Sequence, residues 1–328
     1  MNEVLALAGQ NLLSPVVLAF VLGLVAALAR SDLSIPEAMA KGLSIYLLFA
    51  IGLKGGVEVA ATGLNAQIGL GLVVGVILSA ALPLLAYALL RLMSGLDEVN
   101  AAAVAGHYGS ISIVTFVAAS SLLQSVGVTF EGWLVAVAAV MEAPAILTAL
   151  WLASRAASHG NGNGNGGMPW REISLNGSIV LLIGAFFIGW AVGPAGMAEV
   201  EGFFISPFKG ILCLFLLDMG LVAGRGLRNS AHHLRPGLVG FGILMPVIGG
   251  LIGAIAGWLI GLSTGGVAIL ATLSASASYI AVPAAMRVAL PRANPAIYLT
   301  LALGVTFPFN LAFGITLYLL MARWLTGG

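Results

Sequence analysis

Long apolar runs recur along this chain and constrain its fold more than any other feature. Several runs are about 20 residues long, which is the length an α-helix needs to cross the hydrocarbon core of a bilayer. Charged residues make up only 8% of the 328 positions. Soluble domains carry about 25%, so this chain has too little polar surface to cover itself in water. The sequence therefore predicts an all-α membrane protein.

Ten spans fit this length along the chain. Their expected limits are 12–29, 36–53, 66–92, 98–124, 130–154, 173–192, 204–223, 236–260, 264–290 and 295–324. The fourth and ninth are rich in Ser, Gly and Ala, so we expect both to be broken rather than continuous helices. The first run has no basic residues before it, which favours a spanning helix over a cleavable signal peptide.

A Gly/Asn-rich stretch at 157–172 divides the chain into two five-span halves, residues 1–156 and 173–328. Its composition is typical of a flexible linker. Short patterns recur between the halves in one order at offsets near 165, such as Ser110-Ile-Ser112 with Ser276-Ala-Ser278. An odd number of spans per repeat forces opposite orientations. The sequence thus predicts the inverted repeats found in many secondary transporters.

The distribution of Lys and Arg predicts the orientation, because cytoplasmic loops carry an excess of these residues. Assigning loops alternately to the two sides places ten basic residues on the linker side. Only Lys54, Lys209 and Arg323 fall on the other. We therefore expect the linker in the cytoplasm and both termini outside, in the cytoplasmic (inner) membrane of a bacterium.

Small hydroxyl residues in the two interrupted spans suggest an anion site. The fourth span contains Ser110, Ser112 and Thr115, and the ninth contains Ser276 and Ser278. A half-helix that begins near the bilayer centre presents unpaired N–H groups and about half a positive charge. Two such ends could bind an anion without Lys or Arg. The alternative is that these small residues pack continuous helices.

Ionisable residues at membrane depth are candidates for function because they are costly there. Glu142 lies in the fifth span just before Pro144, at a place equivalent to Thr306. Its carboxylate could ligate Na⁺ with nearby carbonyls and hydroxyls, carry a proton, or be a neutral structural group. Asp218 is the second candidate; it could ligate a cation or form a structural pair with Lys54 or Arg225.

Other chemistry-bearing residues give weaker signals. His107 is either a structural hydrogen-bonding residue or part of the site, whereas adjacent His232 and His233 are expected to be solvated loop residues. A formal net charge of +1 gives no case for binding nucleic acid. No nucleophile elbow, Walker motif or zinc-protease motif is present. We expect no enzyme activity, no ATP drive and no cofactor other than a coupling ion.

Six short motifs resemble those of the sodium-dependent bicarbonate transporter family best known from cyanobacteria. They occur in one order: Ile-Gly-Leu-Lys-Gly-Gly at 51–56, His-Tyr-Gly-Ser-Ile-Ser at 107–112, Phe-Glu-Gly-Trp at 130–133, Met-Glu-Ala-Pro-Ala at 141–145, Ser-Ala-Ser-Tyr-Ile-Ala-Val-Pro at 276–283 and Pro-Arg-Ala-Asn-Pro at 291–295. The resemblance implies ten helices in two inverted repeats, a mobile core domain against a scaffold domain, and a homotrimer. It also implies bicarbonate between the broken fourth and ninth helices, with Na⁺ beside it.

The resemblance assigns roles to residues that match the motifs. Substrate contacts would come from Gly109, Ser110, Ser112 and Thr115 in the fourth span and from Ser276, Ser278 and Tyr279 in the ninth. The cation would be held near Glu142, with Ser112, Ser278, Thr306 and Asp218 as further candidates.

Departures from the cyanobacterial pattern point to a non-cyanobacterial branch. Glu142 stands where that pattern has Asp. Ile113 and Val114 stand where it has Gly and Ser, so the fourth-span break is poorer in hydroxyls. The family's longer cytoplasmic loop is associated with a trimeric PII-like regulator, and its reduction to the Gly/Asn linker argues against such a partner.

The sequence thus favours Na⁺-coupled uptake of bicarbonate or a similarly small anion by alternating access. Symport of a small organic anion is the nearest alternative, and proton coupling or exchange through Glu142 is another. An anion channel or a membrane sensor is the alternative from a different class.

Overall fold

The computed structural model describes residues 13–327, except residues 64, 159–176, 231–233, 280–281, 284–285, 287–289 and 291. The described residues form helices and connecting loops without a β-strand, which confirms the all-α prediction. Most of the Gly/Asn linker, both loop histidines and Arg287 lie outside the described residues.

The helices follow the apolar runs. They are α2 (Pro15–Leu28), α3 (Glu37–Thr62), α4 (Ala66–Met93), α5 (Glu98–His107), α6 (Ile113–Ser125), α7 (Leu134–Val140), α8 (Glu142–Ser158), α10 (Gly177–Phe204), α11 (Phe208–Ser230), α12 (Pro236–Leu259), α13 (Thr264–Ala275), α15 (Pro295–Leu301), α16 (Phe307–Phe309) and α17 (Ile315–Thr326). Short π-helical segments, η2 (Ala302–Thr306) and η3 (Asn310–Gly314), join the last three into one long unit. In the described part of the chain, seven helical segments are long and apolar enough to cross a membrane.

Polar side chains at the start of several helices explain where these helices begin. Ser14, Asn65, Asp97 and Ser263 each accept a hydrogen bond from a backbone amide in the first turn that follows. Such caps pair amides that have no partner within the helix. Proline occupies the first position of α2, α12 and α15, where its missing N–H costs nothing.

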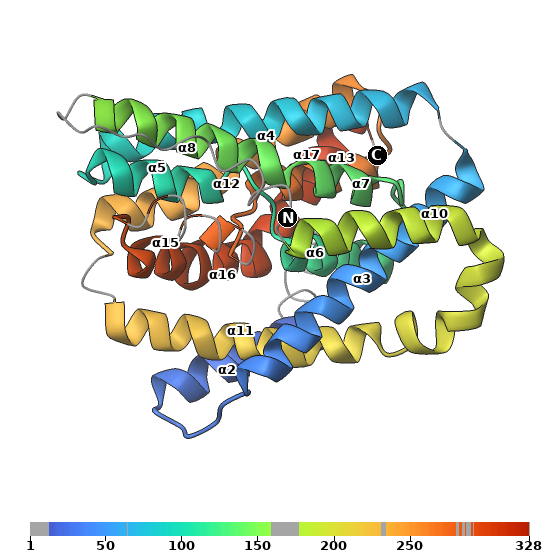
Figure 1. Cartoon of the computed structure of the whole chain (residues 1–328), viewed down its shortest axis with the longest axis horizontal. Helices are drawn as coiled ribbons and strands as arrows, with labels where there is room; N and C mark the ends of the chain where they lie inside the picture. The colour runs from blue at the N-terminus through green and yellow to red at the C-terminus, as the bar shows by residue number, and fades with distance from the viewer. Residues whose placement is uncertain are drawn as a thin grey trace.

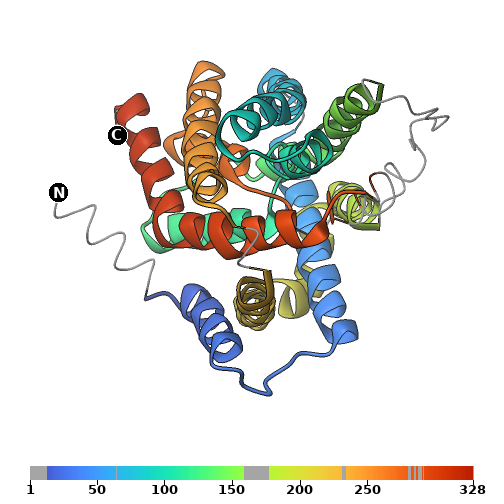
Figure 2. The same cartoon turned by 90° about the vertical axis from the view of Figure 1, so that its left-hand side faces the viewer.

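Two groups of helices make up the molecule. In the first, which we call the four-helix group, α2 packs against α11 and α3 packs against α10 and α11. The second, the crossing group, contains α4 to α8 and α12 to α17. In Figure 1, α2 and α11 lie along the lower edge and α4 and α8 along the upper edge. Figure 2 shows the same separation from the end of the molecule.

Glycines set the distance between helices of the four-helix group. A Cβ atom added to Gly23, Gly56, Gly189 or Gly220 would lie between 1.9 and 2.1 Å from a carbonyl oxygen of the facing helix. Only a residue without a side chain allows the backbones to approach this closely.

Three expectations from the sequence were wrong in detail. Lys54, assigned to an external loop, lies inside α3, which continues to Thr62. The fifth span consists of two helices that meet at Met141. The sixth does not end at 192, because α10 continues to Phe204 across a kink at Gly193, whose φ of 61° favours glycine.

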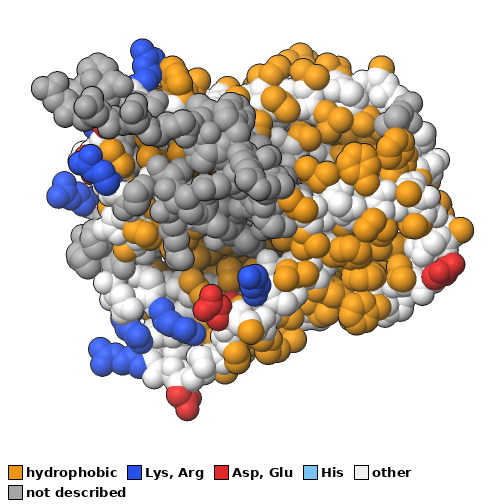
Figure 3. Space-filling view, viewed as in Figure 1, with side chains coloured by type: hydrophobic (Ala, Val, Ile, Leu, Met, Phe, Trp, Pro, Cys, Tyr) orange, Lys and Arg blue, Asp and Glu red, His pale blue; other side chains and the backbone are white. Residues whose placement is uncertain are grey.

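Much of the surface of the described residues is apolar. Large hydrophobic side chains such as Leu22, Val73, Phe187 and Ile255 are exposed. In Figure 3, hydrophobic side chains cover much of the right half, and most of the visible Lys and Arg side chains gather toward the left end. An apolar surface of this kind suits contact with lipid.

Candidate functional site

The fourth span is interrupted between His107, where α5 ends, and Ile113, where α6 begins. Ser112 caps α6, because its hydroxyl accepts hydrogen bonds from the Thr115 amide at 3.1 Å and the Thr115 hydroxyl at 2.8 Å. Ser110, Ser112 and Thr115 are all at least 97% buried. The interruption therefore lies inside the protein, as backbone outside a helix must do at membrane depth.

The ninth span leaves helical geometry after Ala275, and its buried non-helical backbone crosses the interruption in the fourth. The Ser112 amide donates to the Ser276 hydroxyl at 2.9 Å, and the Ser278 amide donates to the His107 carbonyl at 2.8 Å. His107 also hydrogen-bonds the Ser278 carbonyl through Nδ1 at 2.5 Å. The structure thus brings together the hydroxyl residues of the two predicted breaks.

The first turn of α6 carries the features expected of an anion site. Among the described residues, the amides of Ile113 and Val114 have no hydrogen-bond acceptor. Both residues are buried. The buried Tyr279 hydroxyl approaches Ser112 but makes no hydrogen bond of ordinary geometry in the described part of the chain. These unpaired donors belong to the start of α6 or approach its cap, where the helix dipole is positive.

The interruption in the fifth span places Glu142 beside the fourth. Glu142 is the first residue of α8, is 7% exposed, and accepts a hydrogen bond from the Ser110 hydroxyl at 3.3 Å. Ser79 on α4 bridges the interruption: its hydroxyl donates to the Met141 carbonyl and accepts from the Ala145 amide. The Glu142 carboxylate thus contacts Ser110, which precedes the cap residue Ser112 by two positions in the sequence.

The tenth span contacts the same region from the second half of the chain. The Thr306 hydroxyl pairs with the Tyr108 hydroxyl at 2.6 Å and donates to the Gly242 carbonyl at 2.8 Å. Asn310 donates to the Ala275 carbonyl at 3.0 Å, at the end of α13, and accepts from the Tyr318 hydroxyl. Both lie at the ends of π-helical segments, which often occur at functional sites.

Two further candidate site residues, Gly109 and Asp218, make contacts away from the crossing, and those of Asp218 agree with the structural alternative given above. Gly109 packs against α4, since an added Cβ would lie 2.2 Å from Cγ of Pro83. Asp218 lies on α11 in the four-helix group, where the charge of Arg225 acts on it. No hydrogen bond within the described residues joins Asp218 to the crossing of the two breaks.

Sequence reasoning missed Ser79 and Asn310. Each is a fully buried polar side chain in an apolar helix that binds backbone groups of an interrupted neighbour. The available signal was a polar residue in mid-span, which is expensive in a membrane unless it has a partner.

Comparison with protein families identifies the family of the chain. Residues 15–323 match the Na⁺-dependent bicarbonate transporter superfamily. The chain belongs to this superfamily. The match spans the described helices from α2 into α17, so it covers both helix groups and the crossing between them. A search of curated proteins gave no match. Membership of a transporter superfamily and the apolar helices make the chain an integral membrane transporter.

Proposed function

We propose that this member of the superfamily is a Na⁺-coupled symporter of bicarbonate, or of a similarly small monovalent anion, that works by alternating access. The observation that carries the proposal is the buried crossing of the two interrupted spans, in which Ser112 contacts Ser276 and His107 contacts Ser278. Family membership supports the choice of solute.

The anion binds at the start of α6. The free amides of Ile113 and Val114 donate to its oxygen atoms, and the Tyr279 hydroxyl supplies a further donor. Ser112 and Ser276 hold the backbone around the anion, because their hydroxyls are already engaged in the cap and in the crossing. Backbone amides at a helix N-terminus suit a small oxyanion, because such an anion offers only a few oxygen atoms to bind and has no room for contacts with large side chains.

Na⁺ binds on the Glu142 side of the same crossing. Hard cations take oxygen ligands, and the Glu142 carboxylate, the Ser110 hydroxyl and the carbonyl end of α5 supply them. Thr306 and Ser278 remain further candidates through the Tyr108 and His107 contacts. Because the two ligands share one crossing, both favour the same conformation, which is the condition for coupling.

Paired contacts support two inverted five-span repeats. Gly23 and Gly189 are 166 positions apart, and the carbonyls that face them, Leu217 and Leu53, are 164 positions apart in the reverse order. Gly56 and Gly220 repeat the arrangement with Phe186 and Phe20. The packing of α2 from the first half on α11 from the second thus corresponds to that of α10 from the second half on α3 from the first. In this proposal the four-helix group is the scaffold and the crossing group moves against it.

Basic residues support the linker-inside orientation. Basic side chains occupy the last turns of α4, α8 and α11, which all end on the linker side in this topology. Both termini then lie outside, in a bacterial cytoplasmic membrane. A homotrimer, the absence of a PII-like regulator and the absence of any cofactor beyond Na⁺ stay predictions.

The test is uptake of labelled bicarbonate into proteoliposomes that contain the purified protein. Saturable uptake that is lost when choline replaces Na⁺ is the expected result, and Glu142→Gln should remove the Na⁺ dependence. Glu37→Gln is the matched control, because Glu37 is an exposed residue in the first turn of α3. Uptake that follows an imposed pH gradient without Na⁺ would instead establish proton coupling, and flux without saturation would establish a channel.

A further inference from the structure

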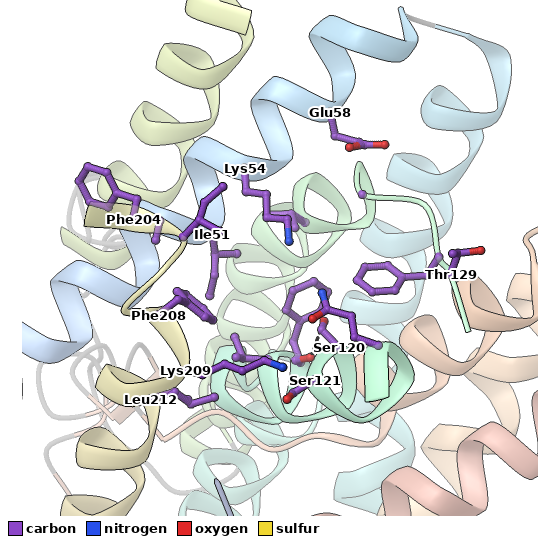
Figure 4. Close-up of a pocket in the computed structure, with 18 of the residues that line it drawn as sticks. Ile51, Lys54, Glu58, Ser120, Ser121, Thr129, Phe204, Phe208, Lys209 and Leu212 are labelled. Atoms are coloured by element: carbon purple, nitrogen blue, oxygen red, sulfur yellow. Dashed lines mark hydrogen bonds between the residues drawn. The ribbon is translucent and has the colours of Figure 1, made fainter. Parts of the chain in front are cut away.

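A cavity of about 560 Å³ lies where the four-helix group meets the crossing group. Its walls come from α3, α6, the loop before α7, the end of α10 and the start of α11. Figure 4 shows it between these elements. None of the residues assigned above to the anion or the cation lines it, so it is separate from the crossing of the two breaks.

Two lysines extend into this cavity from opposite walls. Lys54 comes from α3 and Lys209 from the first turn of α11. In Figure 4 both side chains point into the space between the helices. The whole chain has three lysines, the third being Lys41, so two of the three line one cavity.

The lysines are not neutralised within the described part of the chain. Neither forms a hydrogen bond or an ion pair there, where the one salt bridge is between Arg91 and Glu98. The only carboxylate among the lining residues is Glu58, which lies against Gly132. Figure 4 shows it further along α3 than Lys54. The cavity therefore has an excess of positive charge on walls that are otherwise largely apolar, and such walls strengthen the local field.

Lys54 occupies a costly position for a structural lysine. It lies well inside a helix of 26 residues, and its side chain is exposed although its neighbours Leu53 and Gly55 are buried. A charged side chain at membrane depth faces a water-filled cavity or a partner. Since Lys54 has no partner in the described residues, the cavity is what keeps its ammonium group hydrated.

The cavity ends close to the anion site. Phe116 and Val117 form its inner wall, one turn along α6 from the Ser112 cap. Phe116 packs edge-on against Phe130, with 6.3 Å between ring centroids. Ser121 and neighbouring polar residues of α6 add groups that can hydrogen-bond an oxyanion without fixed charge.

We propose that this cavity is an anion antechamber, in which Lys54 and Lys209 bind a small oxyanion before it passes Phe116 to the start of α6. The proposal rests on the proposed function, since it adds a second, outer binding position for the same class of solute. It also assigns the cavity to the side of the membrane opposite the linker.

The charge of the cavity can be measured without transport. In a Cys213→Ala background, which removes the single native thiol, Ser121→Cys places a reporter on the cavity wall. The purified protein in detergent is treated with an anionic and with a cationic methanethiosulfonate reagent. The same thiolate attacks the sulfur of either reagent and releases methanesulfinate, so the ratio of the two rates reports the local field rather than the reactivity of the thiol.

We expect the anionic reagent to be favoured, and Lys54→Gln with Lys209→Gln to lower the rate ratio on the order of tenfold. Millimolar bicarbonate should slow the anionic reagent in the parent and not in the double variant. Lys41→Gln, an exposed position on the same α3, is the matched control and should leave the ratio unchanged. If the rate ratio of the double variant is within twofold of the ratio of the parent, the antechamber proposal is wrong.

Uptake measurements separate this proposal from the proposed function. If the antechamber is correct, the double variant needs several-fold more bicarbonate for half-maximal uptake and keeps its maximal rate. An unchanged half-maximal concentration would overturn a role for the lysines in transport. Absence of bicarbonate uptake in the parent would defeat the proposed function, whereas the labelling ratio still decides whether the cavity binds anions.

Discussion

Replacement of Gly189 by alanine tests the packing on which the proposed scaffold depends. The new Cβ would lie 2.0 Å from the Leu53 carbonyl oxygen and 3.0 Å from the Val57 amide of α3. Non-bonded heavy atoms prefer about 3.5–4.0 Å, so α10 and α3 would have to separate by more than about 1 Å. Both clashing atoms belong to the backbone of a helix and cannot rotate away.

The magnitude follows from two opposing terms. Overpacking of this kind costs about 1–3 kcal/mol, whereas alanine gains up to about 1 kcal/mol over glycine in a helix. A clash with backbone belongs at the upper end of the first range, so Gly189→Ala should lose about 2 kcal/mol. Gly23→Ala should lose a similar amount, because its Cβ would meet a carbonyl of α11 at 2.1 Å in the equivalent contact.

The assay is reversible unfolding of the purified protein in mixed micelles, in which the fraction of denaturing detergent is increased stepwise. Gly184→Ala on the same α10 is the control, because nothing lies within 4 Å of its added Cβ. The control should equal the parent or exceed it slightly. If Gly189→Ala is as stable as Gly184→Ala, the close approach of α3 and α10 is not part of the native packing and the reasoning fails.

Three further predictions concern the crossing group. Gly109→Ala should abolish uptake, because its Cβ clashes with Pro83 and displaces the fourth-span interruption; uptake equal to the parent in a correctly folded variant would contradict this. Ser79→Ala should lose about 1–3 kcal/mol in the same unfolding assay, because it leaves a buried carbonyl and a buried amide unpaired at the interruption between α7 and α8. Asp97→Ala removes the cap of α5 and should cost about 1 kcal/mol at neutral pH. Burial raises the pKa of Asp97, but hydrogen bonds from the backbone and side chain of Asn100 outweigh it and hold the pKa below its usual range. A carboxyl group whose pKa is lower in the folded state stabilises the fold at pH values above its unfolded pKa, and this stabilisation is lost as the pH falls through the folded pKa. Unfolding at a series of pH values should therefore show the free energies of the parent and Asp97→Ala converging only in acid.

The sequence predicted the helical class and the interruption in the fourth span, because apolar length and clustered small polar residues are local signals. It also selected Ser110 and Glu142, which the structure places in contact. It failed at Lys54, since a charge after an apolar run resembles the end of a span. Only the cavity formed by α6 and α11 reveals why a lysine is tolerated there.

The internal repeat illustrates a second limit. The Ile-Gly-Leu at 51–53 ahead of Gly56 resembles the Met-Gly-Leu at 219–221 ahead of Gly224, which aligns these two glycines. Equivalent contacts instead pair Gly56 with Gly220, one helical turn earlier. A shift of four residues returns nearly the same helix face, so periodicity in a glycine-rich helix cannot distinguish the two alignments. The facing carbonyls distinguish them, and those belong to helices far away in the sequence.

The charge of Glu142 sets the strength of coupling in the proposed mechanism. Its one hydrogen bond among the described residues comes from Ser110, and no cation lies in salt-bridge contact with it there. Two like charges about 6 Å apart repel by about 3 kcal/mol at an effective dielectric constant of about 20. The half-charge at the start of α6 attracts the anion whether or not Na⁺ is bound, so the filled and the empty cation site differ by the repulsion from the carboxylate. Neutralising the carboxylate with Na⁺ then strengthens anion binding by about 3 kcal/mol, or roughly a hundredfold. The same arithmetic applies to Glu142→Gln, which should bind the anion without Na⁺ about a hundredfold more tightly than the parent does without Na⁺. A variant that binds no anion under either condition would mean that the carboxylate holds the crossing together and does not tune its charge.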